Sequence, residues 1–174
     1  MKAFLFTLSI TLLTAIGVAG EPVVQKVAEV EIFVSVDCPI ANSYVPLLDR
    51  LEKQYQAKGI QFLLVYPESG LTGSDLQKHR SEFDISIKGT LDPNHEHVKR
   101  AGATVTPEVV VYDNHGKLAY RGMIDNLYTD FGDRRKVATI HYLRDVLDAL
   151  VEGAEIPHSS TTPVGCFIEE IDAD

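Results

Sequence analysis

The order of apolar segments in this 174-residue chain leaves few folds open to it. Residues 31–36 and 60–66 are apolar runs of strand length, and residues 41–58 between them place apolar side chains at a period of 3.6. A strand, an amphipathic helix that ends at Gly59 and a second strand predict two parallel strands joined by a crossover helix. We therefore expect an α/β fold with helices on both faces of a central sheet, because residues 60–66 show no polar alternation.

The second half of the chain adds an antiparallel strand pair, which makes the expected sheet mixed. Residues 105–113 form a strongly apolar strand with Pro107 near its start, where proline is tolerated. The segment 113–116 has the composition of a hairpin turn and leads into a partner strand at 118–122. Other expected elements are a helix from Ser74 to about Asp84, a short strand at 85–87, helical turns at 95–102 and a last amphipathic helix at 134–151.

Cys38 lies where the first expected strand ends and the first helix begins, and Pro39 follows it. Proline suits the first turn of a helix, because its φ is fixed and its missing N–H needs no partner there. A sulfur at this position faces free backbone N–H groups and the positive end of the helix dipole, which favour the thiolate. Asp37 opposes this effect by like-charge repulsion, and it either caps the helix or relays protons. The position therefore predicts a reactive thiol at Cys38.

The first twenty residues have the pattern of an export signal. Lys2 precedes a mostly apolar run at 3–19, and small residues at 18–20 suit a signal peptidase, which predicts Glu21 as the mature N-terminus. A retained membrane anchor is the alternative, because the run is close to the lower limit of a span, about 17 residues. We expect an exported protein, periplasmic or secreted, without a membrane-spanning segment once the signal peptide (1–20) is removed.

The remaining chain has the size of one domain. We expect this domain at residues 21–155, followed by a C-terminal arm at 156–174 whose prolines, serines and Gly165 favour a mobile or extended segment over a helix. A net charge of −9 repels nucleic acid and anionic membranes, so neither is an expected partner. The sequence has neither a glycine-rich dinucleotide loop nor a phosphate loop, so we expect no organic cofactor.

Cys38 and Cys166 are the two cysteines of the chain. In an oxidising compartment an even number of cysteines suggests a structural disulfide, which would close a long loop and add about 4 kcal/mol in the chain-entropy model. Structural cysteines usually lie in apolar surroundings, whereas Cys38 lies at a strand–helix junction and Cys166 follows a glycine in the arm. This placement favours a redox role over a structural one.

Four segments carry a resemblance to a known family. They are Asp37-Cys38-Pro39-Ile40-Ala41-Asn42, Gly102-Ala103-Thr104-Val105-Thr106-Pro107-Glu108, Tyr120-Arg121-Gly122-Met123-Ile124-Asp125-Asn126 and Gly165-Cys166-Phe167-Ile168. In this order they make nearly all of the mature chain resemble the thioredoxin-fold redoxins, in particular the exported redoxin or peroxiredoxin-like domains of the thiol-specific antioxidant type. The resemblance implies a thioredoxin-like fold and an oxidoreductase activity.

The resemblance also implies roles for single residues. Cys38 becomes the nucleophile, Pro107 the cis-proline beside it, and Pro46 a proline that kinks the active-site helix, although that helix could also simply begin there. Arg121 is a candidate for a supporting guanidinium. The chain departs from the thioredoxin C-x-x-C pattern at Ala41, so Cys38 cannot form the usual short-range disulfide.

The peroxiredoxin pattern P-x-x-x-[ST]-x-x-C is matched only in part, because Ser35 occupies the hydroxyl position while Glu31 stands at the proline position. Attack by Cys38 on a disulfide leaves a mixed disulfide, and attack on a peroxide leaves a sulfenic acid; a second thiol resolves either product. Cys166 is the internal candidate for that thiol. We therefore expect a reversible Cys38–Cys166 bond that a thiol–disulfide partner protein or a small thiol reduces.

Two other functions remain open. One is copper handling by a thioredoxin-fold protein, for which His95, Glu96, His97 and the nearby Asp92 offer ligands. The spacing argues against a compact site, because neighbours on one helix face lie three or four residues apart, and a C-x-x-x-C pair is missing near Cys38. The other is a non-enzymatic binding domain stabilised by a Cys38–Cys166 disulfide.

Overall fold

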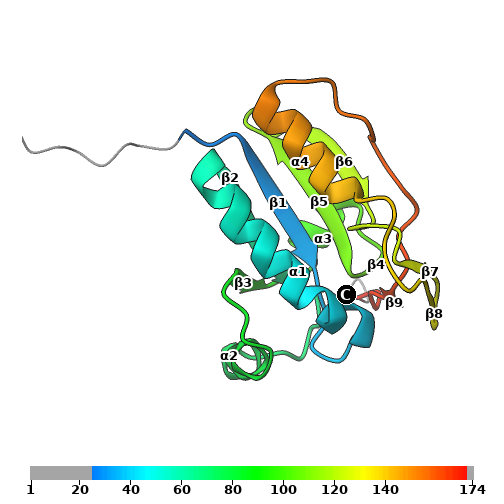
Figure 1. The fold of residues 1–174 in the computed structure, drawn as a ribbon. Helices are drawn as coiled ribbons and strands as arrows, with labels where there is room; N and C mark the ends of the chain where they lie inside the picture. The colour runs from blue at the N-terminus through cyan, green and yellow to red at the C-terminus, as the bar shows by residue number, and fades with distance from the viewer. Residues whose placement is uncertain (1–24, 172–174) are drawn as a thin grey trace, which may run out of the picture.

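A five-stranded sheet lies at the centre of the computed structural model, which describes residues 25–171 (Figure 1). The signal peptide expected at residues 1–20 lies outside the described residues. The sheet has the order β3-β2-β1-β5-β6 and contains both parallel and antiparallel pairs. Its strands are β1 (Ala28–Phe33), β2 (Ile60–Tyr66), β3 (Lys88–Leu91), β5 (Glu108–Asp113) and β6 (Leu118–Gly122).

The pairing of β1 with its two neighbours determines which loops meet at the site. β1 runs parallel to β2, with Ala28 opposite Ile60, and antiparallel to β5, with Phe33 opposite Glu108. The parallel pair and the 118–122 hairpin partner are confirmed. Because β1 ends where β5 begins, the loop that follows Phe33 and the residues that precede Glu108 lie at the same edge of the sheet.

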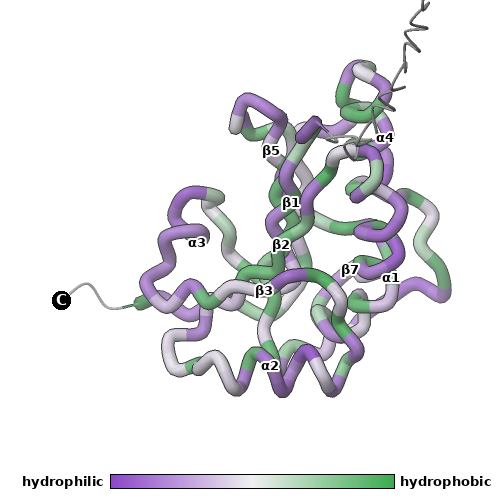
Figure 2. The backbone as a smooth tube through the Cα atoms, turned by 90° about the vertical axis from the view of Figure 1, so that its left-hand side faces the viewer, coloured by the Kyte–Doolittle hydropathy of each residue, from purple (hydrophilic) through white to green (hydrophobic). Residues whose placement is uncertain are grey.

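Helices cover both faces of the sheet, as the sequence predicts. α1 (Pro39–Tyr55) and α4 (Tyr142–Glu152) lie on one face, α3 (Glu96–Ala101) lies on the other, and α2 (Gly73–Glu82) lies beyond β3 (Figures 1 and 2). Alternate β1 side chains point to opposite faces. Val30 and Ile32 join the large core with α1 and α4, whereas Phe33 joins a smaller core with Val98 of α3.

The helix after Cys38 begins at Pro39 and runs through Pro46, so the alternative that it begins at Pro46 is wrong. Tyr44, Leu48, Leu51 and Tyr55 form part of its buried side, which follows the predicted 3.6-residue period. A 3₁₀ turn (Gln56–Lys58) continues the chain to Gly59, whose φ is 87°. Glycine adopts this left-handed conformation without steric cost, which explains why the helix stops there.

Two expected elements have different bounds. The last helix begins at Tyr142 and not at 134; Val137 (67% exposed) and Ile140 (40% exposed) precede it, and Arg134 belongs to a short hairpin of β7 (Tyr128–Asp130) and β8 (Asp133–Arg134). The strand expected at 85–87 is replaced by β3. Ile85 and Ile87 pack in the large core without pairing in the sheet, so their apolar character reflects burial rather than strand pairing.

The C-terminal arm is extended and docked against the domain. It first bridges Arg121 at Ser160, and Thr161 then donates its backbone N–H to the Arg121 carbonyl at 3.0 Å. Further on, β9 (Cys166–Phe167) pairs antiparallel with β4 (Val105–Thr106). Within residues 25–171, no helix combines the length and the apolar composition needed to cross a membrane.

Candidate active site

Cys38 is the N-cap residue of α1. Its Sγ accepts a hydrogen bond from the Ala41 N–H at 3.4 Å, and its side chain is only 1% exposed. This contact satisfies one of the free N–H groups in the first turn of the helix. Asp37 is exposed, and its backbone N–H donates to Ser35 Oγ at 3.4 Å. The interpretation of Asp37 as the helix cap is therefore wrong, because the cysteine sulfur fills that place.

Three chain segments meet at the sulfur of Cys38. The Thr106 carbonyl oxygen lies 3.0 Å from Cys38 Sγ and accepts the proton of the thiol form. The peptide bond between Thr106 and Pro107 is cis, and both residues are buried. Cys166 Sγ donates to Cys38 Sγ across 2.7 Å, and both cysteines are free thiols. The structure thus brings Cys38, Cys166 and Pro107 together.

The pairing of β9 with β4 explains how Cys166, which lies 128 positions after Cys38 in the sequence, reaches the N-terminus of α1. Cys166 lies directly opposite Thr106 in this ladder, and Phe167 lies opposite Val105. The Ile168 N–H donates to the Thr104 carbonyl at 3.0 Å and extends the pairing by one residue. Since Thr106 is also the residue that contacts Cys38, one short ladder places both sulfurs side by side.

The two thiols differ in acidity. Burial by itself raises the pKa of Cys38, but hydrogen bonds, foremost those from the Cys166 side chain and the Ala41 N–H and then those from Thr106 and the Cys166 backbone, hold this pKa below the usual value of a thiol. Burial, together with the hydrogen bond to Cys38, raises the pKa of Cys166 to about 12. Of the two thiols, Cys38 is therefore the one that loses its proton more readily.

Two side chains hold the loop before Cys38: Asn42, which belongs to the motif around Cys38, and Glu68, which the sequence did not single out. Glu68 Oε1 accepts the Val36 N–H at 3.0 Å, and Asn42 Nδ2 donates to the Val36 carbonyl at 2.9 Å. Asn42 Oδ1 is in turn 2.9 Å from Nε2 of His79, a buried residue of α2. The sequence position of Glu68, shortly after β2, could have indicated its role. β1 and β2 are parallel, so the loops that follow them lie at the same edge of the sheet.

Arg121 contacts the loop before Pro107 rather than either sulfur. Its Nη1 donates to the Gly102 carbonyl at 3.0 Å, and its Nε lies 3.4 Å from the carboxylate of Glu108. Glu108 is 1% exposed and also accepts the Thr104 N–H at 2.8 Å. The guanidinium thus stabilises the segment that leads into β5, which is a supporting role at a distance from the thiols.

Tyr44 lies on the buried side of α1, as the sequence indicates. Its hydroxyl donates to Asp125 Oδ1 at 2.6 Å, and its ring centroid lies 5.7 Å from that of Tyr128. Burial, reinforced by the Asp125 carboxylate, raises the pKa of the Tyr44 phenol. Neither contact reaches a sulfur, so these residues stabilise the packing between α1 and the segment after β6.

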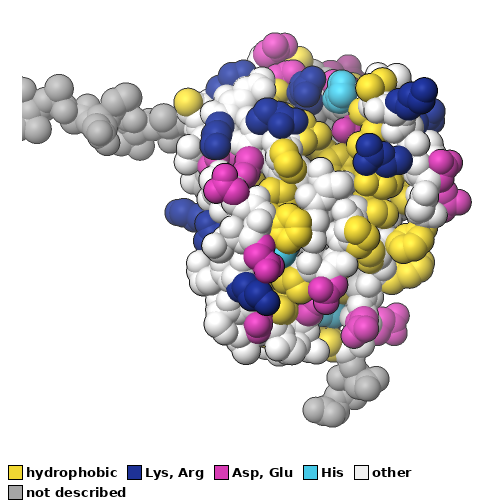
Figure 3. All heavy atoms as spheres, turned by 60° about the horizontal axis from the view of Figure 1, so that its bottom comes forward, with side chains coloured by type: hydrophobic (Ala, Val, Ile, Leu, Met, Phe, Trp, Pro, Cys, Tyr) yellow, Lys and Arg dark blue, Asp and Glu magenta, His cyan; other side chains and the backbone are white. Residues whose placement is uncertain are grey.

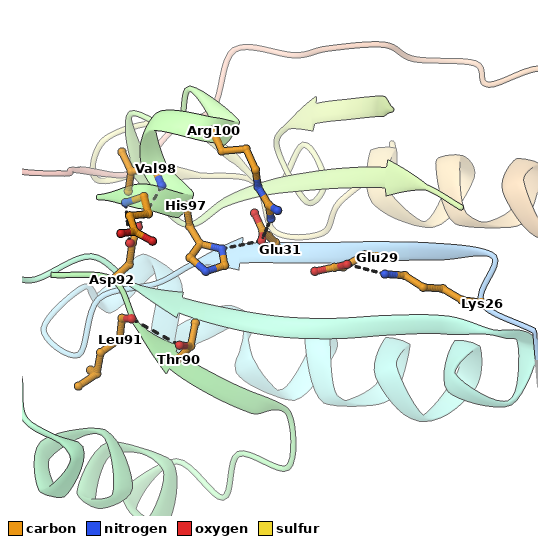
Figure 4. A network of polar contacts seen from close by, with 10 residues as sticks. Lys26, Glu29, Glu31, Thr90, Leu91, Asp92, His97, Val98 and Arg100 are labelled. Atoms are coloured by element: carbon orange, nitrogen blue, oxygen red, sulfur yellow. Dashed lines mark hydrogen bonds and ion pairs between the residues drawn. The ribbon is translucent and has the colours of Figure 1, made fainter. Parts of the chain in front are cut away.

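The residues considered for copper point to separate partners. His95 Nε2 lies 2.9 Å from the Pro67 carbonyl, and both carboxylate oxygens of Asp92 accept backbone N–H groups of α3. His97 Nδ1 lies 2.7 Å from Oε1 of the buried Glu31, which also pairs with Arg100 (Figure 4). Within residues 25–171, no group of three or more histidine, cysteine, aspartate or glutamate side chains has the arrangement of a metal site.

Comparisons with known proteins agree with this architecture. Two solved structures, an uncharacterised conserved protein from Geobacillus kaustophilus and a hypothetical protein from Sinorhizobium meliloti, share 24% and 21% identity with the chain, both with a TM-score of 0.73. They cover 87% and 86% of this chain, which covers 82% of each of them.

A third structure, a candidate thiol:disulfide interchange protein DsbE from Chlorobium tepidum, shares 18% identity at a TM-score of 0.50, over 56% of this chain and 67% of its own. These likenesses establish a thioredoxin-like fold. A search of the curated proteins found no match.

The sequence model of the family described as Redoxin matches residues 18–138, a range that contains Cys38 and Pro107 but not Cys166. That match supports a thiol-dependent redox function in general terms. Because it spans more than half of the chain, the protein belongs to the redoxin family.

Proposed function

We propose that this protein is an exported thiol–disulfide oxidoreductase in which Cys38 is the nucleophile and Cys166 is the resolving thiol. The observation that carries the proposal is the 2.7 Å contact between the two sulfurs at the N-terminus of α1. A cysteine at a helix N-terminus with a lowered pKa is the form of thiol that attacks disulfides and peroxides. Pro107 and the Thr106 carbonyl form the backbone against which a substrate sulfur would align.

The proposed cycle oxidises the two cysteines in two steps, attack by Cys38 and resolution by Cys166. The Cys38 thiolate attacks one sulfur of a substrate disulfide, forms a mixed disulfide and releases the other sulfur as a thiolate. Cys166, after losing its proton, attacks Cys38 in the mixed disulfide, which forms the Cys38–Cys166 bond and releases the second substrate thiol. With a peroxide, the first step gives a Cys38 sulfenic acid and an alcohol or water, and the second step releases water. Two electrons from a partner thiol protein or a small thiol then restore both thiols.

The arrangement of the chain supports a division into three parts. Residues 1–20 would act as the signal peptide, 21–155 as the redoxin domain and 156–174 as the arm that delivers Cys166. The docked path of the described arm supports the last of these assignments. Expression in a bacterial host with mass measurement of the exported protein tests the first, and a mature chain that starts at Glu21 is the expected product.

Activity assays on single-cysteine variants test the proposed function. We expect wild-type protein to reduce a model protein disulfide or hydrogen peroxide with a thiol reductant, and the ratio of the two rates identifies the preferred reaction. Cys38→Ser should lose all activity, whereas Cys166→Ser, assayed without the thiol reductant, should react once and stop as a mixed disulfide or a sulfenic acid. Turnover that survives Cys38→Ser would overturn the proposal.

A further inference from the structure

An open groove lies beside the two cysteines. It has a volume of about 480 Å³ and is bordered by the loop before Cys38, the loop after β2 and the arm from Cys166 to Ile171. Figure 3 shows acidic side chains next to the point where the described chain ends. We call this hollow the acidic groove, because its described lining includes the carboxylates of Asp37, Glu68, Glu169 and Glu170 and no lysine or arginine.

The groove gives access to one sulfur and not to the other. Cys166 lines the groove and is partly exposed, whereas Cys38 is 1% exposed. Of the two cysteines, only Cys166 is among the described residues that line the groove. In thiol–disulfide exchange the incoming thiolate must reach the sulfur that it attacks, so access selects which cysteine reacts. With the arm docked, an external thiol reaches Cys166 first.

Two residues of the groove wall carry buried polar atoms that lack a partner. Thr106 lines the groove, is 2% exposed, and its Oγ1 has no hydrogen-bond partner among residues 25–171. Glu68 Oε2 is likewise buried without a described partner, although Oε1 of the same carboxylate accepts the Val36 N–H. Buried polar atoms are normally hydrogen-bonded, so both residues leave an unsatisfied acceptor in the groove wall. A carboxylate in particular favours a cationic donor.

The groove is large enough to hold a short polypeptide segment. Its volume of about 480 Å³ lies in the range of sites that enclose drug-sized ligands, roughly 300–1,000 Å³. At the rim, Phe167 is 87% exposed, which provides an apolar contact next to the reactive cysteine. Aromatic residues are enriched in surfaces that bind a protein partner.

We propose that a positively charged polypeptide segment carrying a cysteine binds in the acidic groove and reduces the oxidised protein by attacking Cys166, with Cys38 as the leaving group. This inference rests on the proposed function, because it requires the Cys38–Cys166 disulfide. It deepens that function by assigning the chemical class of the reducing partner and the sulfur at which that partner enters.

Reduction of the Cys38–Cys166 disulfide by the partner proceeds through two thiol–disulfide exchanges. The partner thiolate attacks Cys166 Sγ and forms a mixed disulfide with it; the Cys38–Cys166 bond breaks and its electron pair stays on Cys38 as a thiolate. A second thiol of the partner attacks the partner sulfur of the mixed disulfide, which oxidises the partner and releases Cys166, and Cys166 then takes up a proton. The acidities agree with this direction, because the thiol with the lower pKa leaves faster and Cys38 has the lower pKa of the pair.

The attacked sulfur is identified on the oxidised wild-type protein. Acetylated and amidated peptides Lys-Cys-Lys, Ser-Cys-Ser and Glu-Cys-Glu serve as reductants, the reaction is stopped early with an alkylating reagent, and peptide masses locate the adduct. We expect the peptide adduct on Cys166 and the alkyl group on Cys38. An adduct found mainly on Cys38 would overturn the inference while leaving the proposed function intact.

The charge preference is measured with the same three peptides at equal thiolate concentration. At low ionic strength we expect Lys-Cys-Lys to react about ten-fold faster than Glu-Cys-Glu, with a smaller difference at high salt. Glu169→Gln/Glu170→Gln should reduce the ratio several-fold. Glu152→Gln/Glu155→Gln, which removes the same charge from exposed positions at the end of α4 and beyond it, is the matched control and should keep the ratio.

The possible failures are distinguishable. Equal rates for the three peptides, or an equal loss of preference in both double variants, would overturn the inference alone. If oxidation of the wild-type protein produces no Cys38–Cys166 bond, both the inference and the proposed function fail.

Discussion

The acidity of Cys38 depends on two hydrogen-bond donors that come from different parts of the chain. The Ala41 N–H belongs to the first turn of α1, whereas the Cys166 thiol belongs to the arm. Both stabilise a negative charge on Cys38 Sγ, and they are the largest of the hydrogen bonds that lower the pKa of Cys38 against the burial that opposes it. The arm is therefore expected to activate the nucleophile as well as to resolve its adducts.

Removing the donor of the arm should raise the pKa of Cys38. We expect Cys166→Ala to shift it upward and Cys166→Ser, which keeps an O–H donor, to shift it less. The ultraviolet absorbance of the thiolate, measured as a function of pH, gives the pKa of Cys38 directly, because Cys38 is the one remaining cysteine of both variants. Identical titrations of the two variants would show that the donor has no effect.

The lowered pKa of Cys38 also makes the stability of the reduced wild-type protein depend on pH. Because the pKa of Cys38 is lower in the folded than in the unfolded chain, its thiolate stabilises the fold above the unfolded value of about 8.5, and this contribution is lost as the pH falls through the folded pKa. Urea unfolding across this range should show a smaller pH dependence for Cys166→Ala than for Cys166→Ser.

The backbone of Val36 is held at both its polar groups, by Glu68 at the N–H and by Asn42 at the carbonyl. Asn42→Ala should lower the free energy of unfolding by about 1–3 kcal/mol, because it leaves the Val36 carbonyl and His79 without this partner. Asn42→Asp, which keeps an acceptor for His79, should cost less. Urea unfolding measures both, and equal costs would contradict a role for the contact with His79.

Among the elements, the arm depends on close backbone approach where it meets the domain. A Cβ on Gly165 would collide with the Thr106 carbonyl oxygen, and a Cβ on Gly122 would collide with Thr161 of the arm. These two glycines thus permit the contact of the arm with β4 and with β6 respectively. Apolar residues of the arm, Ile156, Val164 and Ile168, also pack against the two cores.

Gly165→Ala should weaken the pairing of β9 with β4 and make the Cys38–Cys166 bond easier to reduce. In a glutathione redox titration we expect its equilibrium constant for bond formation to fall about ten-fold or more, since a collision with backbone cannot be relieved by a side-chain rotation. Gly70→Ala is the control, because no atom lies within 4 Å of the added Cβ. An unchanged constant for Gly165→Ala would mean that β9 does not position Cys166.

Sequence patterns predicted most elements but not the contacts between them. The 3.6-residue period of α1 and the apolar run of β2 are local signals, and both are confirmed. Val137 and Ile140 also fit a helical period but lie exposed before α4, because a period shows which residues share a face and not whether that face is buried. Glu68 lay outside these predictions, because its contact with the loop before Cys38 arises from the pairing of distant strands.

Across the whole molecule, the proposed bond links residues 128 positions apart. Closing so long a loop restricts the unfolded chain and should stabilise the oxidised protein by roughly 4–5 kcal/mol in the chain-entropy model. Urea unfolding of the oxidised and reduced forms measures this difference, with Cys38→Ser/Cys166→Ser as a control that should show none. Equal stabilities of the two wild-type forms would argue against a bond between these cysteines.

The proposed function depends on a bond between Cys38 and Cys166 that opens and closes in the folded protein. The decisive measurement is non-reducing peptide mapping at a series of glutathione redox ratios, with free thiols alkylated at each point. We expect a peptide joining Cys38 to Cys166 under oxidising conditions, which disappears under mild reduction without unfolding and returns on reoxidation. A joined peptide that is never recovered, or one that persists until the protein unfolds, would show that no reversible bond links these cysteines.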